Sequence, residues 1–174
     1  MNFLPFEHFS IVTSLSPAQA QERLEQEVSA DTGFSFNKLF SSPDKYFSGY
    51  VANGTFEIKR IINYRNSFLP VIKGSIEFDI DGSRIQVKMQ PHILVIVFMC
   101  IWLSGTLIGG LAFLTQQLHS SSNFDVTALM PFGMFIFGYL LAMGGFKYEV
   151  PKARIKLVEL LGGSLELQDT KYLS

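Results

Sequence analysis

The side chains that most often act as nucleophiles, general bases or metal ligands are few and scattered along this chain of 174 residues. His8, His92 and His119 fall in three segments that we expect to lie apart, so they do not converge on one metal ion. The single cysteine, Cys100, lies in an uncharged apolar run and forms neither an internal disulfide nor a metal site alone. No serine has a neighbouring histidine and acid to activate it. The sequence therefore predicts no enzyme activity, no metal site and no cofactor.

The most polar stretch of the predicted soluble part is residues 63–70, with Arg60 just before it. Arg60, Tyr64, Arg65 and Asn66 are the best candidates for a binding site. Basic groups near an anionic leaflet gain about 1 kcal/mol each, so these residues are suited to an anionic lipid headgroup or a partner protein. The alternative is a solvated loop between two hairpins.

Two long apolar runs are the elements that we expect to position the rest of the chain relative to a membrane. Residues 92–115 and 127–146 contain no Asp, Glu, Lys or Arg, and each reaches the ~20 residues that a helix needs to cross ~30 Å of hydrocarbon. A helix is the only way in which one such segment satisfies its own backbone in lipid. We predict a transmembrane hairpin over residues 92–146; the alternative is a pair of buried helices in a soluble protein. An ion pathway normally needs ionisable groups at depth, so a transporter acting alone is not predicted.

Small and large residues recur on one face of each predicted span, at steps of three and four. The first face consists of Phe98, Trp102, Gly105, Gly109 and Ala112, and the second of Ala128, Pro131, Phe135, Gly138, Ala142 and Gly145. Antiparallel alignment puts Trp102 on Gly138, Phe98 on Ala142 and Phe135 on Gly105. Close packing of this kind holds helices together in lipid. The alternatives are that Gly105 and Gly109 form a dimer seam, or that the glycines are incidental.

Residues 1–91 are predicted to form a cytoplasmic α+β domain with a small antiparallel sheet. Residues 7–15 read as a strand with Phe9, Ile11 and Thr13 on one face. Ser16 and Gln19 fit a capping box that opens a helix. Its apolar stripe consists of Ala20, Leu24 and Val28, and residues 31–33 end it. Residues 34–45 read as a core-packed strand and loop or as a loop dipping into the membrane surface.

Two hairpins complete the predicted sheet. Asn53-Gly54 and Asp81-Gly82 both favour a two-residue turn. The second turn places Phe78 opposite Ile85 and Asp79 opposite Arg84, with the charges on the wet face. The buried face of that hairpin would comprise Ile72, Ile76, Phe78, Ile80, Ile85, Val87 and Met89.

Residues 147–174 are predicted to contain a separate amphipathic helix and a loosely ordered tail. Pro151 opens the helix and Gly162-Gly163 stops it. Its apolar face consists of Ala153, Leu157, Leu160 and Leu161. This helix is expected to pack on the sheet or on the membrane surface.

Two features of the sequence resemble known proteins, a set of residue motifs and the order of the predicted helices and strands. Phe47-x-Gly49, Phe68-x-Pro70 and Gly74 together resemble small uncharacterised bacterial membrane proteins with two spans, which implies no activity. The order strand, helix, antiparallel strands and final helix is similar to a helix-grip (START-like) domain with an inserted hairpin. It is also similar to a bacterial PH-like domain, in which a C-terminal helix closes a sheet.

The charges predict how the chain sits in its membrane. Of the fourteen Lys and Arg, nine precede residue 92 and five follow residue 146. Segments that flank transmembrane helices and are rich in Lys and Arg remain on the cytoplasmic side of the membrane. We predict a multi-pass protein of the plasma (inner) membrane, with both termini cytoplasmic. Its partners would be the lipid bilayer and an anionic lipid or a membrane protein, and the net charge of −1 gives no reason to expect nucleic acid.

The functional prediction is a non-catalytic, membrane-proximal binding or scaffold domain. The alternative is an accessory subunit of a larger membrane complex, with the hairpin as its main contact.

Overall fold

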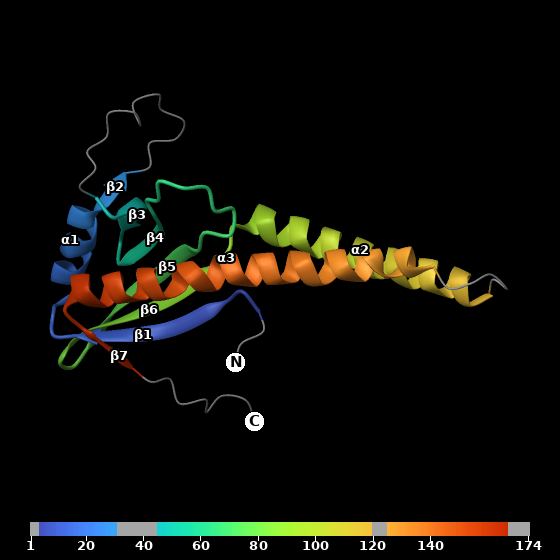
Figure 1. Ribbon diagram of the computed structural model, residues 1–174. Coiled ribbons are helices and arrows are strands. Elements are labelled where there is room, and N and C mark those ends of the chain that lie inside the picture. Colours follow the sequence, from blue (N-terminus) through green and yellow to red (C-terminus); the bar gives the residue numbers. More distant parts are fainter. Residues whose placement is uncertain (1–3, 31–44, 120–124, 167–174) are drawn as a thin grey trace.

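The computed structural model describes residues 4–30, 45–119 and 125–166, which form a mixed seven-stranded sheet with three α-helices, an α+β arrangement. Figure 1 shows the sheet at one end of the molecule and two long helices extending from it side by side. These helices are α2 (Ile93–His119) and α3 (Met130–Leu161), and a short 3-10 helix, η2 (Val126–Leu129), precedes α3. The predicted segment 34–45 falls almost entirely outside the described residues.

The sheet has the order β2-β3-β4-β5-β6-β1-β7. Its strands are β1 (Glu7–Thr13), β2 (Val28–Ala30), β3 (Phe47–Ala52), β4 (Thr55–Arg60), β5 (Val71–Asp79), β6 (Gly82–Gln90) and β7 (Ser164–Glu166). All neighbours are antiparallel except β2 and β3, so the prediction of a purely antiparallel sheet is wrong at one edge. The expectation of a loose C-terminal tail is also wrong for residues 164–166, because they pair with β1.

The first helix, α1 (Pro17–Glu27), begins as predicted. The Ser16 hydroxyl accepts from the Gln19 amide, and the Gln19 side chain accepts from the Ser16 amide. The stripe of Ala20, Leu24 and Val28 is buried. The helix ends earlier than residues 31–33, because Val28 is extended and pairs with Phe47 as the first residue of β2.

The turn between β3 and β4 is the predicted one. Asn53 and Gly54 have φ angles of 52° and 70°, and Ala52 pairs with Thr55. Only residues that tolerate positive φ fit both central positions of such a turn.

The turn between β5 and β6 is displaced by one residue from the prediction. Asp79 pairs with Gly82, so the loop residues are Ile80 and Asp81, and Ile76 rather than Phe78 lies opposite Ile85. The cause is Gly82, which has a φ of 144° and passes the end of β1. A Cβ built there would lie 2.2 Å from the Thr13 carbonyl oxygen, so Gly82 belongs in the ladder beside β1.

Two predicted core residues at the end of this hairpin are exposed. Phe78 is 79% exposed and Ile80 is 91% exposed. β4 begins at Thr55, opposite Ser75, so the part of β5 beyond Ser75 pairs in the sheet with β6 alone. The remaining inward residues of the hairpin, Ile72, Ile76, Ile85, Val87 and Met89, are buried as predicted.

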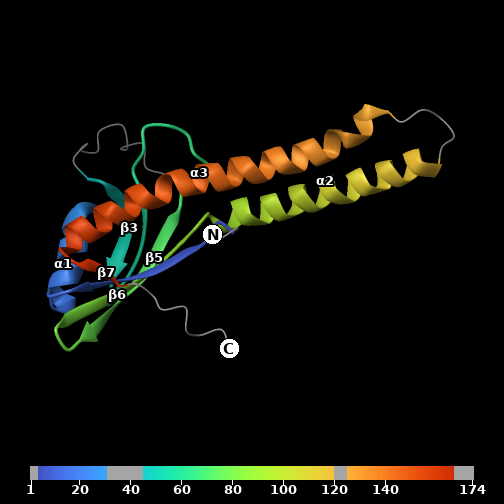
Figure 2. The same cartoon turned by 60° about the horizontal axis from the view of Figure 1, so that its bottom comes forward.

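Helix α3 runs without interruption through Pro151 to Leu161, so the prediction of a separate C-terminal helix is wrong. The Pro151 ring is exposed, and the residues on both sides of it pack into the core. Gly162 ends the helix with a φ of 55°, as the glycine pair predicts. α1 and the C-terminal half of α3 cover the same face of the sheet (Figure 2).

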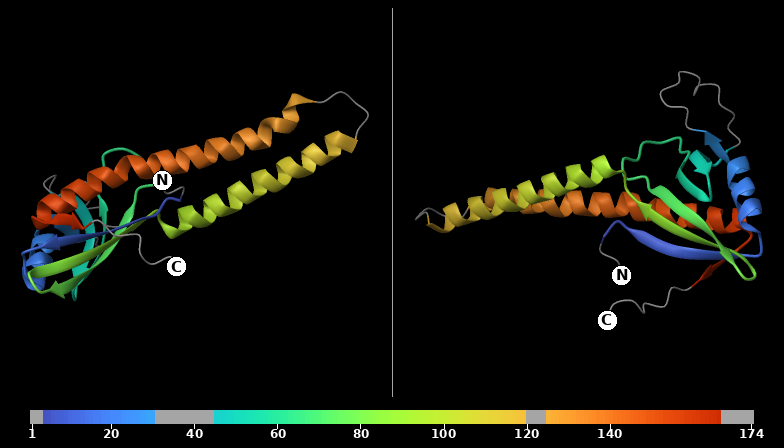
Figure 3. Two further views of the ribbon diagram at one scale, coloured as in Figure 1. Left: turned by 90° about the horizontal axis from the view of Figure 1, so that it is seen from below. Right: turned by 180° about the vertical axis from the view of Figure 1, so that it is seen from behind.

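α2 and α3 are long and apolar enough to cross a membrane. The only buried residue of α2 is Gly110, and the buried residues of α3 begin at Ala142. The far part of the hairpin extends beyond the sheet as a bare pair of helices (Figure 3). An exposed apolar surface of this kind is typical of helices that are covered by lipid or by another protein.

Candidate functional site

Glu149 is a fully buried carboxylate on the side of α3 that faces the sheet. It lies in the stripe formed by Phe146, Val150, Ala153 and Leu157, which packs into the core. A carboxylate out of water is stable in its charged form only when it is paired and hydrogen-bonded. Its partners therefore define the site.

Arg60 and Tyr64 supply those partners. Alternation along β4 points Phe56, Ile58 and Arg60 to the inner face of the sheet. The Arg60 Nη1 group pairs with Glu149 Oε2, and the Tyr64 hydroxyl donates to Glu149 Oε1. Lys152 Nζ lies 3.8 Å from the same Oε1 atom.

The surroundings confine the Arg60 side chain, which is 11% exposed. Its guanidinium carbon lies 4.9 Å from the centroid of the Tyr46 ring, and its buried Nε has no hydrogen-bond partner among the described residues. The hydrogen bond to Glu149, and then burial, raise the pKa of Tyr64. The Tyr64 proton therefore stays in place as a donor to the carboxylate.

The loop of residues 61–70 is also attached to α3 one turn nearer the hairpin. Asn66 Nδ2 donates to the Gly145 carbonyl oxygen at 3.0 Å, and Asn66 Oδ1 accepts from the Phe68 amide at 3.0 Å. A Cβ at Gly145 would lie 3.0 Å from the Phe68 ring and 3.2 Å from Asn66 Oδ1. We call Arg60, Tyr64, Asn66 and Glu149 the junction cluster, because it joins sheet, loop and helix.

The structure brings together three of the four residues predicted to bind an anion. Arg60, Tyr64 and Asn66 all contact α3, so their polar groups are used inside the chain. Arg65 is exposed and has no hydrogen bond or ion pair with the described residues. Sequence reasoning missed Glu149, although extension of the helical stripe from Phe146 through Pro151 would have placed this acid among apolar residues.

The hairpin seam matches the predicted alignment along the helix axes but not the predicted face of α2. A Cβ at Gly138 would lie 3.2 Å from Trp102 Nε1, so Trp102 sits against Gly138. A Cβ at Gly110 would lie 3.1 Å from the Phe132 ring. At Gly105 and Gly109 a Cβ would meet nothing within 4 Å, so the predicted contact of Phe135 with Gly105 is wrong.

The reason is a rotation of α2 by about one residue. Its partly or fully buried positions include Met99, Leu103, Thr106 and Gly110, each one residue after a predicted seam position. Trp102 lies beside this seam and reaches Gly138 with the edge of its large indole. Of the predicted seam residues on the second side, Ala128 of η2 and Ala142 of α3 are buried, and Pro131, Phe135, Gly138 and Gly145 of α3 are partly buried.

An apolar groove of about 320 Å³ lies beside this seam. Phe98 stacks on Trp102, with ring centroids 6.1 Å apart. Both rings line the groove with Leu141 of α3, and Phe68 of the loop lines it too. The groove has no polar lining.

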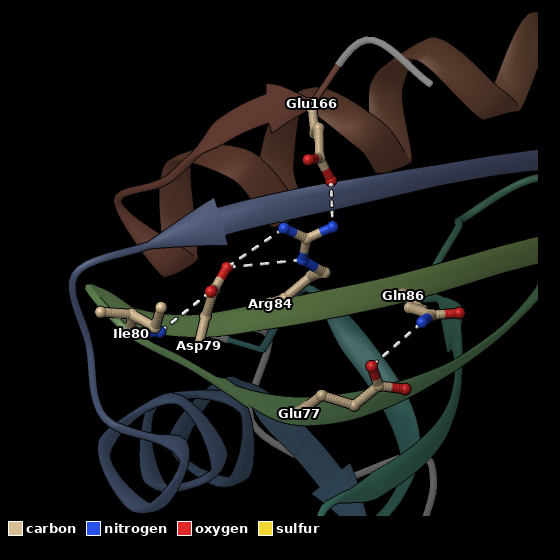
Figure 4. A network of polar contacts seen from close by, with 6 residues as sticks. All are labelled: Glu77, Asp79, Ile80, Arg84, Gln86 and Glu166. Atoms are coloured by element: carbon tan, nitrogen blue, oxygen red, sulfur yellow. Dashed lines mark hydrogen bonds and ion pairs between the residues drawn. The ribbon is translucent and has the colours of Figure 1, made fainter. Parts of the chain in front are cut away.

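The outer face of the sheet carries a separate polar network (Figure 4). Arg84 bridges Asp79 and Glu166, at 3.3 Å and 3.0 Å. Gln86 donates to Glu77 at 3.0 Å. The predicted pairing of Asp79 with Arg84 is confirmed, although the two residues are diagonal rather than directly opposite. These groups are partly exposed, which is typical of a solvated sheet face.

Within residues 4–30, 45–119 and 125–166, no three His, Cys, Asp or Glu side chains are close enough to hold a metal ion. Both oxygens of the buried Glu149 carboxylate accept from donors of its own chain. Comparison of the chain with protein-family models, with curated proteins and with solved structures gave no match.

Proposed function

We propose that this chain is an integral membrane protein whose sheet domain is a non-catalytic binding or scaffold module held at the cytoplasmic surface. The observation that carries the proposal is the single α3 helix, which is bare and apolar in its first half and packed on the sheet in its second. Such a helix joins anchor and domain without a hinge. The junction cluster adds a second attachment through the loop of residues 61–70.

A second candidate function is an accessory subunit of a larger membrane complex. The apolar surface of α2 and α3 favours this accessory role. Along α2, for example, Leu94, Ile101 and Ile108 are exposed. In this case a partner's helices, rather than lipid alone, would cover the hairpin. The sheet would then serve to fix the subunit's orientation.

The first experiment tests membrane insertion and orientation. We expect the full chain to remain in the membrane fraction after alkaline carbonate washing, and a reporter after Ser174 to be active only in the cytoplasm. Release by carbonate would overturn the membrane proposal. A reporter active only outside the cytoplasm would overturn the orientation.

The second experiment separates scaffold from subunit by affinity purification in mild detergent. One variant reverses charges on the outer sheet face, with Lys73→Glu and Lys88→Glu. The other replaces the exposed Ile101 and Ile108 of α2 by Ala. Loss of a stoichiometric partner in the first variant alone supports the scaffold module, whereas loss in the second alone supports the accessory subunit.

A further inference from the structure

The apolar groove between α2 and α3 leads into a polar region on the same side of α3, nearer the sheet. Phe137 and Leu141 line the groove. One and two turns after Leu141, the same side of α3 presents Gly145 and Tyr148. Phe68 packs over Gly145, and Tyr148 is exposed. One side of the helix therefore changes from fully apolar to aromatic and then to charged.

Lys152 marks the charged end. Its ammonium nitrogen lies 3.4 Å from the centroid of the Tyr148 ring, so the side chain leans toward the groove. Arg65 lies next to Tyr64 and Asn66 in the loop that contacts this part of α3, and it has no ion pair with the described residues. Glu149 pairs with Arg60 and also lies 3.8 Å from Lys152 Nζ, so a single carboxylate faces Arg60 and Lys152, and Arg65 adds a further cation in the loop. An excess of positive charge remains at this end.

The spacing of the two ends fits one phospholipid. With a rise of 1.5 Å per residue, Leu141 lies about 10 Å and Met134 about 21 Å below Tyr148 along α3. Half of a bilayer's hydrocarbon core is about 15 Å thick. Since Trp102 lies beside Gly138, Ile93 lies level with Lys147, so the Tyr148 ring and the Lys152 ammonium group over it are level with the start of α2. A phosphate held there would direct its acyl chain into the groove.

We propose that this side of the hairpin is a binding site for a single anionic phospholipid. The phosphate lies against Arg65 and Lys152, and one acyl chain occupies the groove beneath Phe68. The inference rests on the proposed membrane anchoring and identifies a ligand for it. A protein that remains in washed membranes but retains no lipid would disprove this site alone and leave the anchoring intact.

Native mass spectrometry of the full chain in mild detergent tests the site. Phosphatidylglycerol, phosphatidylcholine and inorganic phosphate are titrated separately. We expect one phosphatidylglycerol per chain, at about a tenth or less of the phosphatidylcholine concentration, and no retained phosphate ion. Arg65→Ala with Lys152→Ala should remove this preference, because each cation contributes a similar share. Equal retention of both lipids by the wild type would overturn the proposal.

Matched variants test the position of the site. Leu141→Trp or Met134→Trp fills the groove and should abolish retention, whereas Leu140→Trp places the same ring on an exposed position outside it. Lys147→Ala removes a cation at a similar level but about a third of a turn away, and should leave the preference unchanged. Circular dichroism establishes that each variant is folded. Retention unchanged in both filled-groove variants, or a photocrosslink from residue 141 to a protein instead of lipid, would also overturn the site.

Discussion

Helix α3 packs against two different surfaces, helix α2 and the sheet, and the two contacts are held together in different ways. Toward α2, a glycine of one helix lies against a large side chain of the other, as at Gly138 beneath Trp102 and at Gly110 beneath Phe132. Toward the sheet it buries a continuous stripe that includes Phe146, Leu157 and Leu161. In the bilayer proposed above, lipid would remove the hydrophobic drive between helices, so the first seam would depend on close fit. Water supplies that drive at the second seam.

The two seams also differ in how they treat charge. The sheet seam contains the buried pair of Glu149 and Arg60, whereas the described spans contain no charged residue between Ile93 and Phe146 other than Asp125 at the far turn. A buried pair is weak evidence for stability, because its desolvation offsets much of its attraction. What it does supply is a strict requirement that the loop, β4 and α3 meet in one arrangement.

The largest expected effect comes from breaking that pair. Glu149→Leu leaves the Arg60 guanidinium almost fully buried without its carboxylate, and we expect a loss of about 3–5 kcal/mol in the free energy of unfolding. Urea unfolding followed by far-ultraviolet circular dichroism measures it. The double variant Glu149→Leu with Arg60→Met should recover most of the loss. A double variant as unstable as the single one would contradict this account of the pair.

The next effect tests burial on the two halves of α3. Leu157→Ala removes a fully buried side chain from the sheet seam and should cost about 2–5 kcal/mol. Leu140→Ala makes the same chemical change at an exposed position in the span, and should change stability by less than about 0.5 kcal/mol. Similar losses in the same unfolding assay would mean that something covers Leu140.

A smaller effect is expected from filling the glycine notch of the hairpin. Gly138→Leu overlaps the Trp102 indole, and overpacking of this kind costs roughly 1–3 kcal/mol. Trp102 is the only tryptophan, so its fluorescence reports the unfolding of the hairpin directly. Gly105→Leu is the control, since a side chain there meets open space. Equal effects of the two variants would rule out the notch.

The smallest effect concerns Tyr64 and carries a pH signature. Its pKa is raised in the folded protein, so the contribution of its hydrogen bond is complete below the usual tyrosine pKa of 10. That contribution disappears as the pH rises through the folded value. Tyr64→Phe should cost about 1 kcal/mol at pH 7 and should lose less stability between pH 9 and pH 11 than the wild type. Parallel alkaline profiles would contradict the hydrogen bond to Glu149.

Much of the fold follows from local chemistry in the sequence. Ser16 with Gln19 and the Asn53-Gly54 turn act over four residues or fewer, so they hold wherever the rest of the chain goes. The displaced β5–β6 turn shows the limit. Asp81-Gly82 is a good turn by itself, but Gly82 is needed where the end of β1 passes, and that contact is with a residue far along the chain.

Only part of the candidate site could be predicted from the sequence, for a similar reason. Arg60, Tyr64 and Asn66 were recognisable as a polar group, but their partner Glu149 lies on an element that Pro151 made look interrupted. A proline inside a helix removes a hydrogen bond and costs about 3 kcal/mol. Burial of the stripe on both sides of Pro151 outweighs that cost, and such burial is a tertiary effect.

The continuity of α3 has a mechanical consequence. Its 32 residues form a rod about 48 Å long, of which about 23 Å, from Phe146 onward, lies on the sheet. Spanning helices tilt to match the thickness of the surrounding hydrocarbon. Because the rod has no joint, a change in tilt of about 10° would swing the far end of the sheet by roughly 4 Å. In a bilayer, the angle at which the sheet meets the surface is therefore set by lipid thickness as well as by the protein.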